Sequence, residues 1–524
     1  MQKTVVDGTY RRMYAKFGIE RLIISSIINC IAGLAIVLGL KAVGTPLFAV
    51  VPLAVLSSIA GTLLLMKRLP AELVGIRKRK PWLSYTWLII ALVCVLQTAR
   101  LSIFMIDPSQ TQHSLFPGDK WFVEHCCLTA YSESARLAMD GEKNIYAPEL
   151  YFGAEFIKNK NFRQKIDGFN VDGYHYPPPF LLLPTMARAV VGGNFLHLRM
   201  LWFAIGVLSL LFAIGFITYR LEPEGRLRMI GMAPLFWCSV PVLAGLQMSN
   251  VQIIIIAISI ISMAAFTFNK PVGGILLAMS SVAKIFPGIL MVYLLAQKKF
   301  REVVWVVGFA VVLSIIAFMV VGPNPFLAFI EYELPKLSSG EAFSGPFSRA
   351  FAVAANMAPF GIPLKLGQFG VPGMTLEIGR IVSSIHLLMV LILAIWSGRQ
   401  KPRSNTEMIS VWIAIISLAS LTSPFAPANY VLVPVVLLVC LNREFFRPVA
   451  AIIICLVISA PFLISREAPF LIQALCFLPS QMIAIAVPAF ILYRAGLKVT
   501  SPQGNRLEVP IASEILTNNS IKSN

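Results

Sequence analysis

Long apolar runs are the feature that most constrains how this chain can fold. Runs of about 20 apolar residues recur between residues 22 and 493, and a helix of about this length crosses the hydrocarbon core of a bilayer. Only 13% of the residues are charged and 57% are hydrophobic, whereas a soluble chain is roughly 25% charged. This composition excludes a soluble enzyme, a coiled coil, a disordered chain and a disulfide scaffold. The sequence predicts an all-α, polytopic membrane protein.

The apolar runs predict about 14 transmembrane helices. Lys and Arg gather in connectors between them, and such connectors face the cytoplasm; the basic connectors are 67–80, 220–228, 270, 298–301, 398–403 and 443–447. With both termini inside, the predicted spans are 22–40, 46–66, 82–105, 198–219, 229–246, 250–268, 271–284, 287–297, 302–322, 377–397, 408–426, 430–441, 448–464 and 470–493.

This topology predicts two large outer loops, 106–197 and 323–376. Within the first loop, 178–197 must have both ends outside, so we interpret it as a re-entrant or membrane-surface helix. We expect three regions: a cytoplasmic segment and transmembrane hairpin (1–81), a membrane core (82–494), and a polar cytoplasmic tail, disordered by composition (495–524).

The net charge of +19 does not indicate a nucleic-acid partner, because the basic residues lie in the connectors and no basic stripe with interleaved aromatic residues is present. The eight cysteines lack zinc-site spacing: six lie in apolar runs, and Cys126 and Cys127 are adjacent. We therefore expect neither a metal site nor a disulfide framework.

The first outer loop holds the densest set of functional side chains. Residues 120–139 contain no Gly or Pro and predict a helix along the membrane surface, with Asp119 at its start. Asp119 has two compatible interpretations, as the N-cap of this helix and as a catalytic carboxylate. Glu124, Glu133 and Asp172 are the alternative carboxylates for the catalytic role.

The first outer loop also contains Tyr174-His175-Tyr176 before three consecutive prolines. Three prolines cannot lie in a helix interior, so the segment is either a stiff corner or a fixed wall that holds His175 and Tyr176 over a pocket. Further along, Gln247 and Asn250 lie where two apolar runs meet on the outer side. Their amides either hydrogen-bond sugar hydroxyls or cap the following helix.

Lys284 lies in an apolar stretch, 271–297, that contains no Asp or Glu. A cation within the membrane needs a partner or a watery cavity, and such residues are functional by default. We expect Lys284 to bind a ligand phosphate, with snorkelling to the interface as the alternative. Arg100, near the outer end of its span, is a second candidate. His386 is expected to be a hydrogen-bonded core residue.

Together these motifs resemble the polyprenol-phosphate-sugar-dependent glycosyltransferases of the GT-C superfamily, most closely glycosyltransferase family 87, the mannosyltransferase-like group. The resemblance spans roughly residues 82–440. It rests on an early acidic residue before a helix that ends in Gly and Tyr, a Tyr-Pro-Pro element, a Gly-x-Gln/Asn patch and a Lys-x-x-Pro; here these are Asp119, Gly141, Tyr146, Tyr176-Pro177-Pro178, Gly245, Gln247, Asn250 and Lys284-Ile285-Phe286-Pro287.

The chain departs from the family pattern at three places. Asp119 stands further from Gly141 than in the family, and the hairpin 22–66 is an addition before the core. Where the family has His after a late Ser-Pro segment, this chain offers Asn429 and Tyr430.

The resemblance implies a monosaccharide donor carried on polyprenyl phosphate, such as a mannose donor, and a lipid or glycan acceptor. Transfer would occur on the outer face of the cell membrane, with Asp119 as the catalytic residue. If Lys or Arg meets the charge of the leaving phosphate, no nucleotide site, metal or other cofactor is required.

Two rival functions fit the same architecture. A flippase or exporter of lipid-linked glycans would share the many spans and the basic inner loops, but it would lack a catalytic carboxylate in a structured outer loop. A glycan ligase or polymerase that uses lipid diphosphate donors would rely on outer Arg and His residues, and Arg349 could be one of them.

Overall fold

The computed structural model describes residues 18–152, 164–443 and 445–497. Within these ranges the regular structure is helical except for one short antiparallel hairpin, β1 (Lys165–Ile166) and β2 (Phe169–Asn170). The all-α class is therefore confirmed. The tail predicted to be disordered lies almost wholly outside the described residues.

Seven helices of the described chain are long and apolar enough to cross a membrane. An eighth crossing results if α12 (Pro223–Trp237) and α13 (Val240–Gln247), which meet at an angle of 58°, form one broken span. The predicted count of about 14 is not confirmed. The seven helices are α2 (Ile19–Ala42), α3 (Leu47–Arg68), α5 (Pro81–Ile106), α11 (Phe195–Arg220), α17 (Phe300–Val321), α23 (Leu376–Gly398) and α28 (Phe470–Gly496).

Several predicted spans form helices too short to cross a bilayer alone. At 1.5 Å per residue, the 14 residues of α14 rise about 21 Å, against a hydrocarbon core of about 30 Å. Hydropathy does not distinguish such helices from true spans, because both are apolar on all sides. The short apolar helices are α14 (Gln252–Ala265), α15 (Lys270–Ala283), α16 (Ile289–Ala296), α24 (Asn405–Ser420), α25 (Ala428–Val431), α26 (Val433–Leu441) and α27 (Pro448–Ser459), which continues into η7 (Ala460–Leu463).

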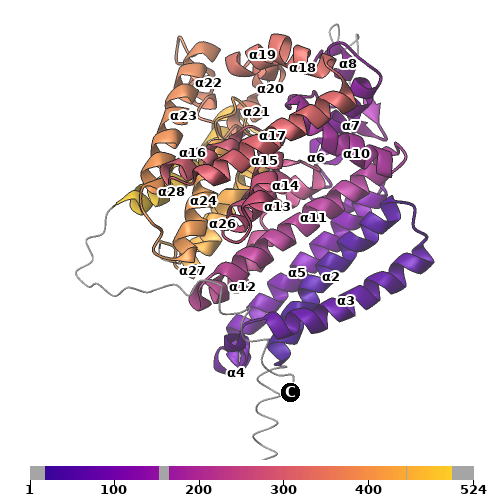
Figure 1. Ribbon diagram of the computed structural model, residues 1–524, viewed down its shortest axis with the longest axis vertical. Coiled ribbons are helices and arrows are strands. Elements are labelled where there is room, and N and C mark those ends of the chain that lie inside the picture. The colour runs from indigo at the N-terminus through magenta and orange to yellow at the C-terminus, as the bar shows by residue number, and fades with distance from the viewer. Residues whose placement is uncertain (1–17, 153–163, 444, 498–524) are drawn as a thin grey trace, which may run out of the picture.

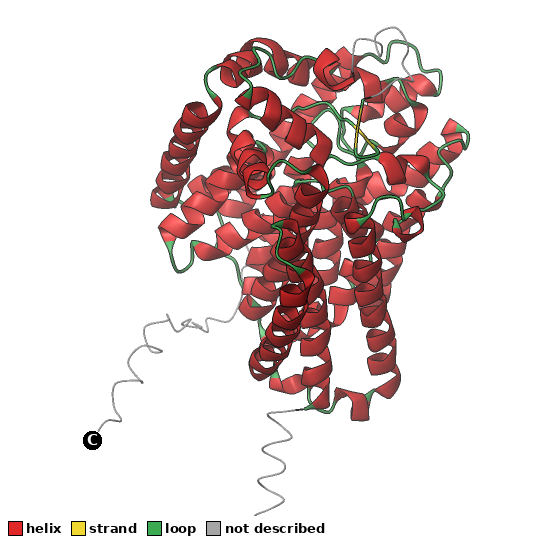
Figure 2. Ribbon diagram, turned by 90° about the vertical axis from the view of Figure 1, so that its right-hand side faces the viewer, coloured by secondary structure: helices red, strands yellow, loops and turns green. Residues whose placement is uncertain are grey.

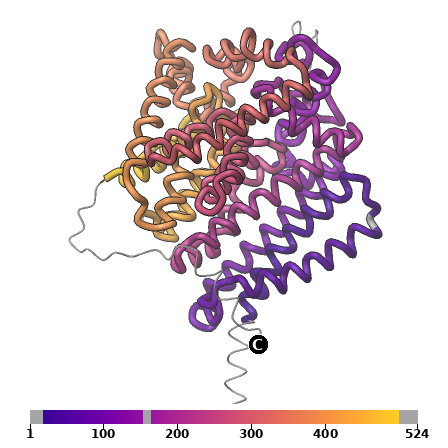
Figure 3. Tube along the Cα trace, in the orientation of Figure 1, coloured from indigo at the N-terminus to yellow at the C-terminus, as the bar shows by residue number. Residues whose placement is uncertain are grey.

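The core and the periphery of the molecule differ in burial. Every residue of α26 is buried, as is the stretch of α24 from Ile409 to Ser420. By contrast, α3 and α17 expose large apolar side chains along much of their length, including Leu56, Leu64 and Met319. An exposed apolar surface of this extent is stable only in lipid. The protein is therefore a multi-pass membrane protein, and its long helices form the bundle seen in Figures 2 and 3.

The two predicted outer loops gather at one end of the molecule (Figure 1). After α3 the chain forms η1 (Ala71–Leu73) and the basic α4 (Ile76–Arg79). Helix α4 lies at the opposite end of the molecule from the two loops (Figure 1). The first loop forms η2 (Thr111–His113), α6 (Lys120–Glu124), α7 (Leu128–Met139), α8 (Glu149–Phe152), η3 (Pro178–Leu181) and α10 (Leu182–Val190). The second forms α18 (Asn324–Ala328), the π-helix η5 (Phe329–Glu333), α19 (Leu334–Ser339), η6 (Glu341–Phe343), α20 (Ser344–Phe347), α21 (Ala350–Ala355) and α22 (Gly361–Gln368).

The single helix predicted over 120–139 is wrong, because the chain leaves helical geometry between α6 and α7. The backbone of His125 pairs with Asn170, and the N–H of Cys127 donates to the Met248 carbonyl at 2.9 Å. The His125 N–H still donates to the Trp121 carbonyl at 2.9 Å, but the Cys127 N–H has a long-range partner in place of a helical one. Because of this break, His125 and Cys127 lie outside both helices. For 178–197, α10 has nine residues and is too short to cross, in agreement with the prediction of a non-crossing segment.

Candidate active site

Lys284 stands where the apolar helix α15 stops. Its backbone is extended (φ −152°, ψ 126°), and Pro287 follows within the short helix η4 (Phe286–Gly288), so the chain turns before α16 begins. The Lys284 Nζ donates to Gln252 Oε1 of α14 at 2.6 Å. Among the described residues, no carboxylate lies within 4.0 Å of this amine. The ammonium is thus held in place by a neutral group.

Two tyrosine rings flank the Lys284 amine. The ring centroids of Tyr176 and Tyr430 lie 5.4 and 5.5 Å from Nζ, within the range of cation–π attraction. Tyr176 belongs to the Tyr-Pro-Pro element, and its hydroxyl forms a 2.9 Å hydrogen bond with that of Tyr131 in α7. Tyr430 lies in α25, at one of the places where this chain departs from the family pattern. Segments far apart in the sequence therefore build one cationic site.

A cluster of His125, Cys127 and Asp172 lies beside this lysine. His125 Nε2 is 3.5 Å from Cys127 Sγ, and His125 Nδ1 is 3.3 Å from Asp172 Oδ2. The Asn250 amide donates to Cys127 Sγ at 3.2 Å. Asn250 Oδ1 in turn accepts the N–H of Gln252, whose Oε1 accepts from the Lys284 amine. The ring of Trp121 stacks on that of His125, with centroids 4.2 Å apart.

The charges around His125 favour its imidazolium form. Burial of the ring opposes that form, but the neighbouring Asp172 and Cys127 side chains outweigh it and raise the pKa of His125 to about 10. The His125 ring therefore contacts a carboxylate oxygen at one nitrogen and a sulfur at the other.

Asp119 is the N-cap of α6, as one of its two interpretations predicts. Its Oδ1 accepts the N–H of Trp121 at 2.9 Å and that of Phe122 at 3.3 Å, while Oδ2 accepts from Arg466 Nε at 2.7 Å. Both side chains of the ion pair are about one quarter exposed. The guanidinium of Arg466 lies over the ring of Trp121, 4.0 Å from its centroid. A row of contacts thus runs from Asp119 through Trp121 to His125.

The amides of Gln247 and Asn250 are buried and bonded within the protein. Gln247 Nε2 donates to the Phe122 carbonyl at 2.7 Å, and its Oε1 accepts the N–H of Leu115. Asn250 Oδ1 accepts the N–H of Gln252, the first residue of α14, at 2.9 Å, but the N-cap of this helix is Val251 and not Asn250 as the alternative interpretation expected. Through these hydrogen bonds, Gln247 and Asn250 connect the first outer loop with the end of α13 and the start of α14.

The remaining candidates lie around this centre. Arg100 Nη2 donates to the Ser114 carbonyl and so fixes the first turn of the outer loop. His175 Nδ1 pairs with the buried Glu333 of η5 at 2.8 Å, which joins the two outer loops. Arg349 is exposed at the start of α21. His386 is buried, with Nε2 3.0 Å from the Leu418 carbonyl oxygen, as expected of a core histidine.

Sequence reasoning missed several residues that the structure brings to this centre. Gln252 and Cys127 were not proposed for binding, and Arg466 was not considered. Arg466 lies in a short polar turn, Ser465-Arg466-Glu467, between two apolar runs. An isolated cation in such a turn, on the same side as Asp119, is a signal that could have found it.

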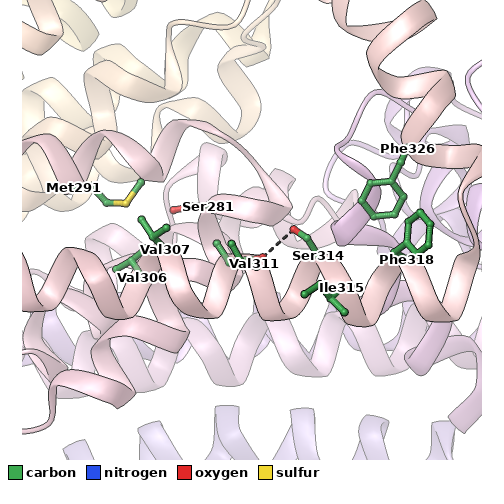
Figure 4. Close-up of a pocket in the computed structure, with 10 residues that line it drawn as sticks. Ser281, Met291, Val306, Val307, Val311, Ser314, Ile315, Phe318 and Phe326 are labelled. Carbon is green, nitrogen blue, oxygen red and sulfur yellow. Dashed lines mark hydrogen bonds between the residues drawn. The ribbon is translucent and has the colours of Figure 1, made fainter.

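An apolar groove begins within one helical turn of Lys284 in the sequence. It lies between α15, α16 and α17, has a volume of about 480 Å³, and is lined by Ser281, Met291, Val306 and Phe318 among others. Figure 4 shows the lining side chains of α17, among them Val306 and Phe318, with Met291 of α16 and Ser281 of α15 across from them. Its lining suits an aliphatic chain.

Comparison with known proteins agrees with these features. The model of glycosyltransferase family 87 matches residues 174–424, a stretch that includes the Tyr-Pro-Pro element, Gln247, Asn250 and Lys284. No curated protein and no solved structure matches the chain. The chain resembles glycosyltransferase family 87 over this central stretch, and it is a membrane glycosyltransferase.

Proposed function

We propose that the protein transfers a hexose, such as mannose, from a polyprenyl-phosphate donor to a lipid or glycan acceptor. The reaction takes place at the end of the molecule where the two large loops gather, on the outer face of the cell membrane. The observation that carries this proposal is Lys284, a cation that contacts a neutral amide and two tyrosine rings and has no carboxylate within 4.0 Å among the described residues.

Phosphate is the anion that suits Lys284. When a sugar leaves a polyprenyl phosphate, the leaving group carries a full phosphate charge, which a positioned cation stabilises. The Tyr176 and Tyr430 rings hold the ammonium on two sides and leave its remaining donors for a ligand. Arg100 and Arg349 are the proposed additional contacts to charged parts of the substrates.

The apolar groove supports a lipid-linked donor. A polyprenyl chain needs an apolar channel that ends near the phosphate-binding cation, and the groove includes Ser281, three residues before Lys284. Each CH₂ of such a chain contributes about 0.8 kcal/mol on burial. A nucleotide sugar would have no use for this surface.

Asp119 is the proposed general base. A sugar hydroxyl becomes a strong nucleophile when a carboxylate takes its proton. The contact row through Trp121 fixes Asp119 relative to His125, which lies on the same outer loop. Gln247, Asn250, His175 and Tyr176 are the proposed walls of the sugar pocket.

The rival donor is a lipid diphosphate, as used by glycan ligases and polymerases. Arg349, exposed on the second outer loop, is the residue that such a reaction would use. Among functions that use lipid-linked sugars, the family match favours glycosyl transfer over flipping or export.

The assignment of Lys284 is tested by donor binding to purified Lys284→Gln. Loss of a charge-assisted contact of roughly 1.5–3 kcal/mol should weaken donor affinity by about 10- to 150-fold. Lys336→Gln is the matched control, because Lys336 also lies over a tyrosine ring, Tyr332, at 3.6 Å. Equal donor affinity in the two variants would return Lys284 to a purely structural role.

A further inference from the structure

The cluster of His125, Cys127 and Asp172 has a geometry that glycosyl transfer through Lys284 and Asp119 does not require. Their nitrogen, sulfur and oxygen atoms all lie within 4.8 Å of one another. We propose that these three side chains form a binding site for a zinc-type divalent ion.

The three side chains are close enough to converge on one tetrahedral ion. Zinc binds sulfur at about 2.3 Å and nitrogen or carboxylate oxygen at about 2.0–2.2 Å, so neighbouring ligand atoms lie roughly 3.3–3.7 Å apart. The contact of His125 with Cys127 is 3.5 Å and that with Asp172 is 3.3 Å. These two contacts are made by different ring nitrogens, so an ion bound at either nitrogen requires the ligand at the other nitrogen to rotate toward it.

The donor set selects the class of ion. A thiolate with an imidazole favours zinc and its transition-metal neighbours, whereas magnesium and calcium prefer oxygen ligands alone. A thiolate and a carboxylate balance the charge of a divalent ion when the imidazole is neutral. Three protein ligands with one position open are typical of zinc sites that also bind water or substrate.

The three side chains are held in place by their own neighbours. The Cys127 N–H donates to the Met248 carbonyl, and the Asp172 N–H donates to Thr129 Oγ1 at 3.1 Å. Trp121 stacks on the His125 ring, and the Asn250 amide donates to the Cys127 sulfur at 3.2 Å, a contact that suits a thiolate. Such outer contacts orient metal ligands and tune their affinity.

The ion would lie close to the proposed phosphate site. Hydrogen bonds link the cluster to Lys284: the Asn250 amide donates to Cys127 Sγ, Asn250 Oδ1 accepts the N–H of Gln252, and Gln252 Oε1 accepts from Lys284 Nζ. A zinc-type ion there would add positive charge beside Lys284, a consequence that rests on the proposed function. The binding site itself does not depend on it.

The test is metal binding by the purified full-length protein, without substrate. Zinc should bind at about one equivalent, and cobalt in its place should produce a thiolate-to-cobalt charge-transfer band. Cys127→Ser and His125→Gln should abolish both signals, and Asp172→Asn should weaken binding roughly 10- to 100-fold. Cys126→Ser, which changes the adjacent buried thiol, should retain them.

A second measurement uses the native chain, so it does not depend on any variant folding. Zinc should protect Cys127 from alkylation, as read by mass spectrometry of the peptide that contains it, while magnesium should not. Failure of the wild-type protein to bind zinc or to show this protection would overturn the proposal, as would equal metal loss in Cys126→Ser. A protein that binds zinc but transfers no sugar from polyprenyl phosphate would refute the donor assignment and leave the metal site standing.

Discussion

At the scale of single residues, Asp119 combines a structural role with a proposed chemical one. Its two carboxylate oxygens receive two backbone N–H groups and one guanidinium N–H. Its cap role alone would explain these contacts. A substitution that keeps the cap and removes the charge separates the two roles.

Asp119→Asn is that substitution. Asn caps helices about as well as Asp, and the quarter-exposed ion pair with Arg466 contributes at most about 1 kcal/mol. We therefore expect a folded protein whose turnover falls roughly 10²-fold or more, because the base is gone. Turnover is measured on purified protein with saturating donor.

Asp140→Asn is the control for this change. Asp140 is an exposed carboxylate of the same loop that pairs with Arg136 at 2.6 Å, and its loss should leave turnover near normal. Should Asp119→Asn behave like this control, the base becomes Glu124 or Asp172.

The residue-level features that sequence predicts are those governed by local rules. The Asp119 cap follows from the preference of Asp for helix starts, and the core role of His386 follows from its isolation in an apolar run. The partners Arg466 and Asp172 come from distant parts of the chain. Their contacts depend on tertiary packing, so no spacing rule reveals them.

At the scale of elements, the end of α15 was predictable and the break between α6 and α7 was not. Pro287 lacks an N–H and restricts the residue before it, which favours a helix end ahead of it. Nothing in residues 120–139 disfavours a helix. There the hydrogen bonds of His125 and Cys127 to distant strands and turns override local propensity.

The contact between α22 and α28 gives a prediction for the effect of pH on stability. Lys365 of α22 is buried, its Nζ donates to Gln481 Oε1 of α28 at 2.7 Å, and burial lowers the pKa of this lysine to about 7. In the unfolded chain the pKa is near 10.5. The unfolded state therefore binds more protons between about pH 7 and 10.5, and stability rises with pH through this window.

We expect this rise to be at most about 1.4 kcal/mol per pH unit for this single group. Relative to Lys365→Met, the wild-type protein should gain thermal stability from pH 7 to pH 9, as measured by unfolding midpoints at a fixed heating rate. Relative to Lys336→Met, which changes a partly exposed lysine, the wild-type protein should show no such gain. A constant difference between wild type and Lys365→Met across this pH range is the result that excludes a neutral buried lysine.

At the scale of the whole molecule, composition predicted the class but not the number of crossings. Hydropathy detects apolar helices, and this chain contains seven that are long enough to cross and several that are too short. Helix α26 and the stretch of α24 from Ile409 to Ser420 are buried because other helices of the bundle pack around them. Because other helices cover them on all sides, their sequences are apolar all round, as the sequence of a membrane span is.

The arrangement of the helices also predicts that the first outer loop and the segment around α4 lie on opposite sides of the membrane. Exposed Ser109, in the first outer loop, and exposed Glu72, beside α4, should react with a membrane-impermeant maleimide from opposite sides when each is replaced by Cys. Ser109→Cys should label from outside intact cells and Glu72→Cys only after permeabilisation. The reverse pattern would place the two large loops in the cytoplasm. Position 160, in the same loop, lies outside the described residues.

The most direct measurement of the central claim is a comparison of sugar donors with one purified preparation in lipid nanodiscs. The protein is given the same labelled hexose on polyprenyl monophosphate, on polyprenyl diphosphate and on a nucleoside diphosphate, with a lipid extract as acceptor. Lys284, together with an apolar groove whose lining includes Ser281 three residues earlier in the sequence, predicts transfer from the polyprenyl monophosphate alone, with transfer strongly reduced in Lys284→Gln. Transfer from the nucleoside diphosphate or the lipid diphosphate, with none from the monophosphate, would contradict the account.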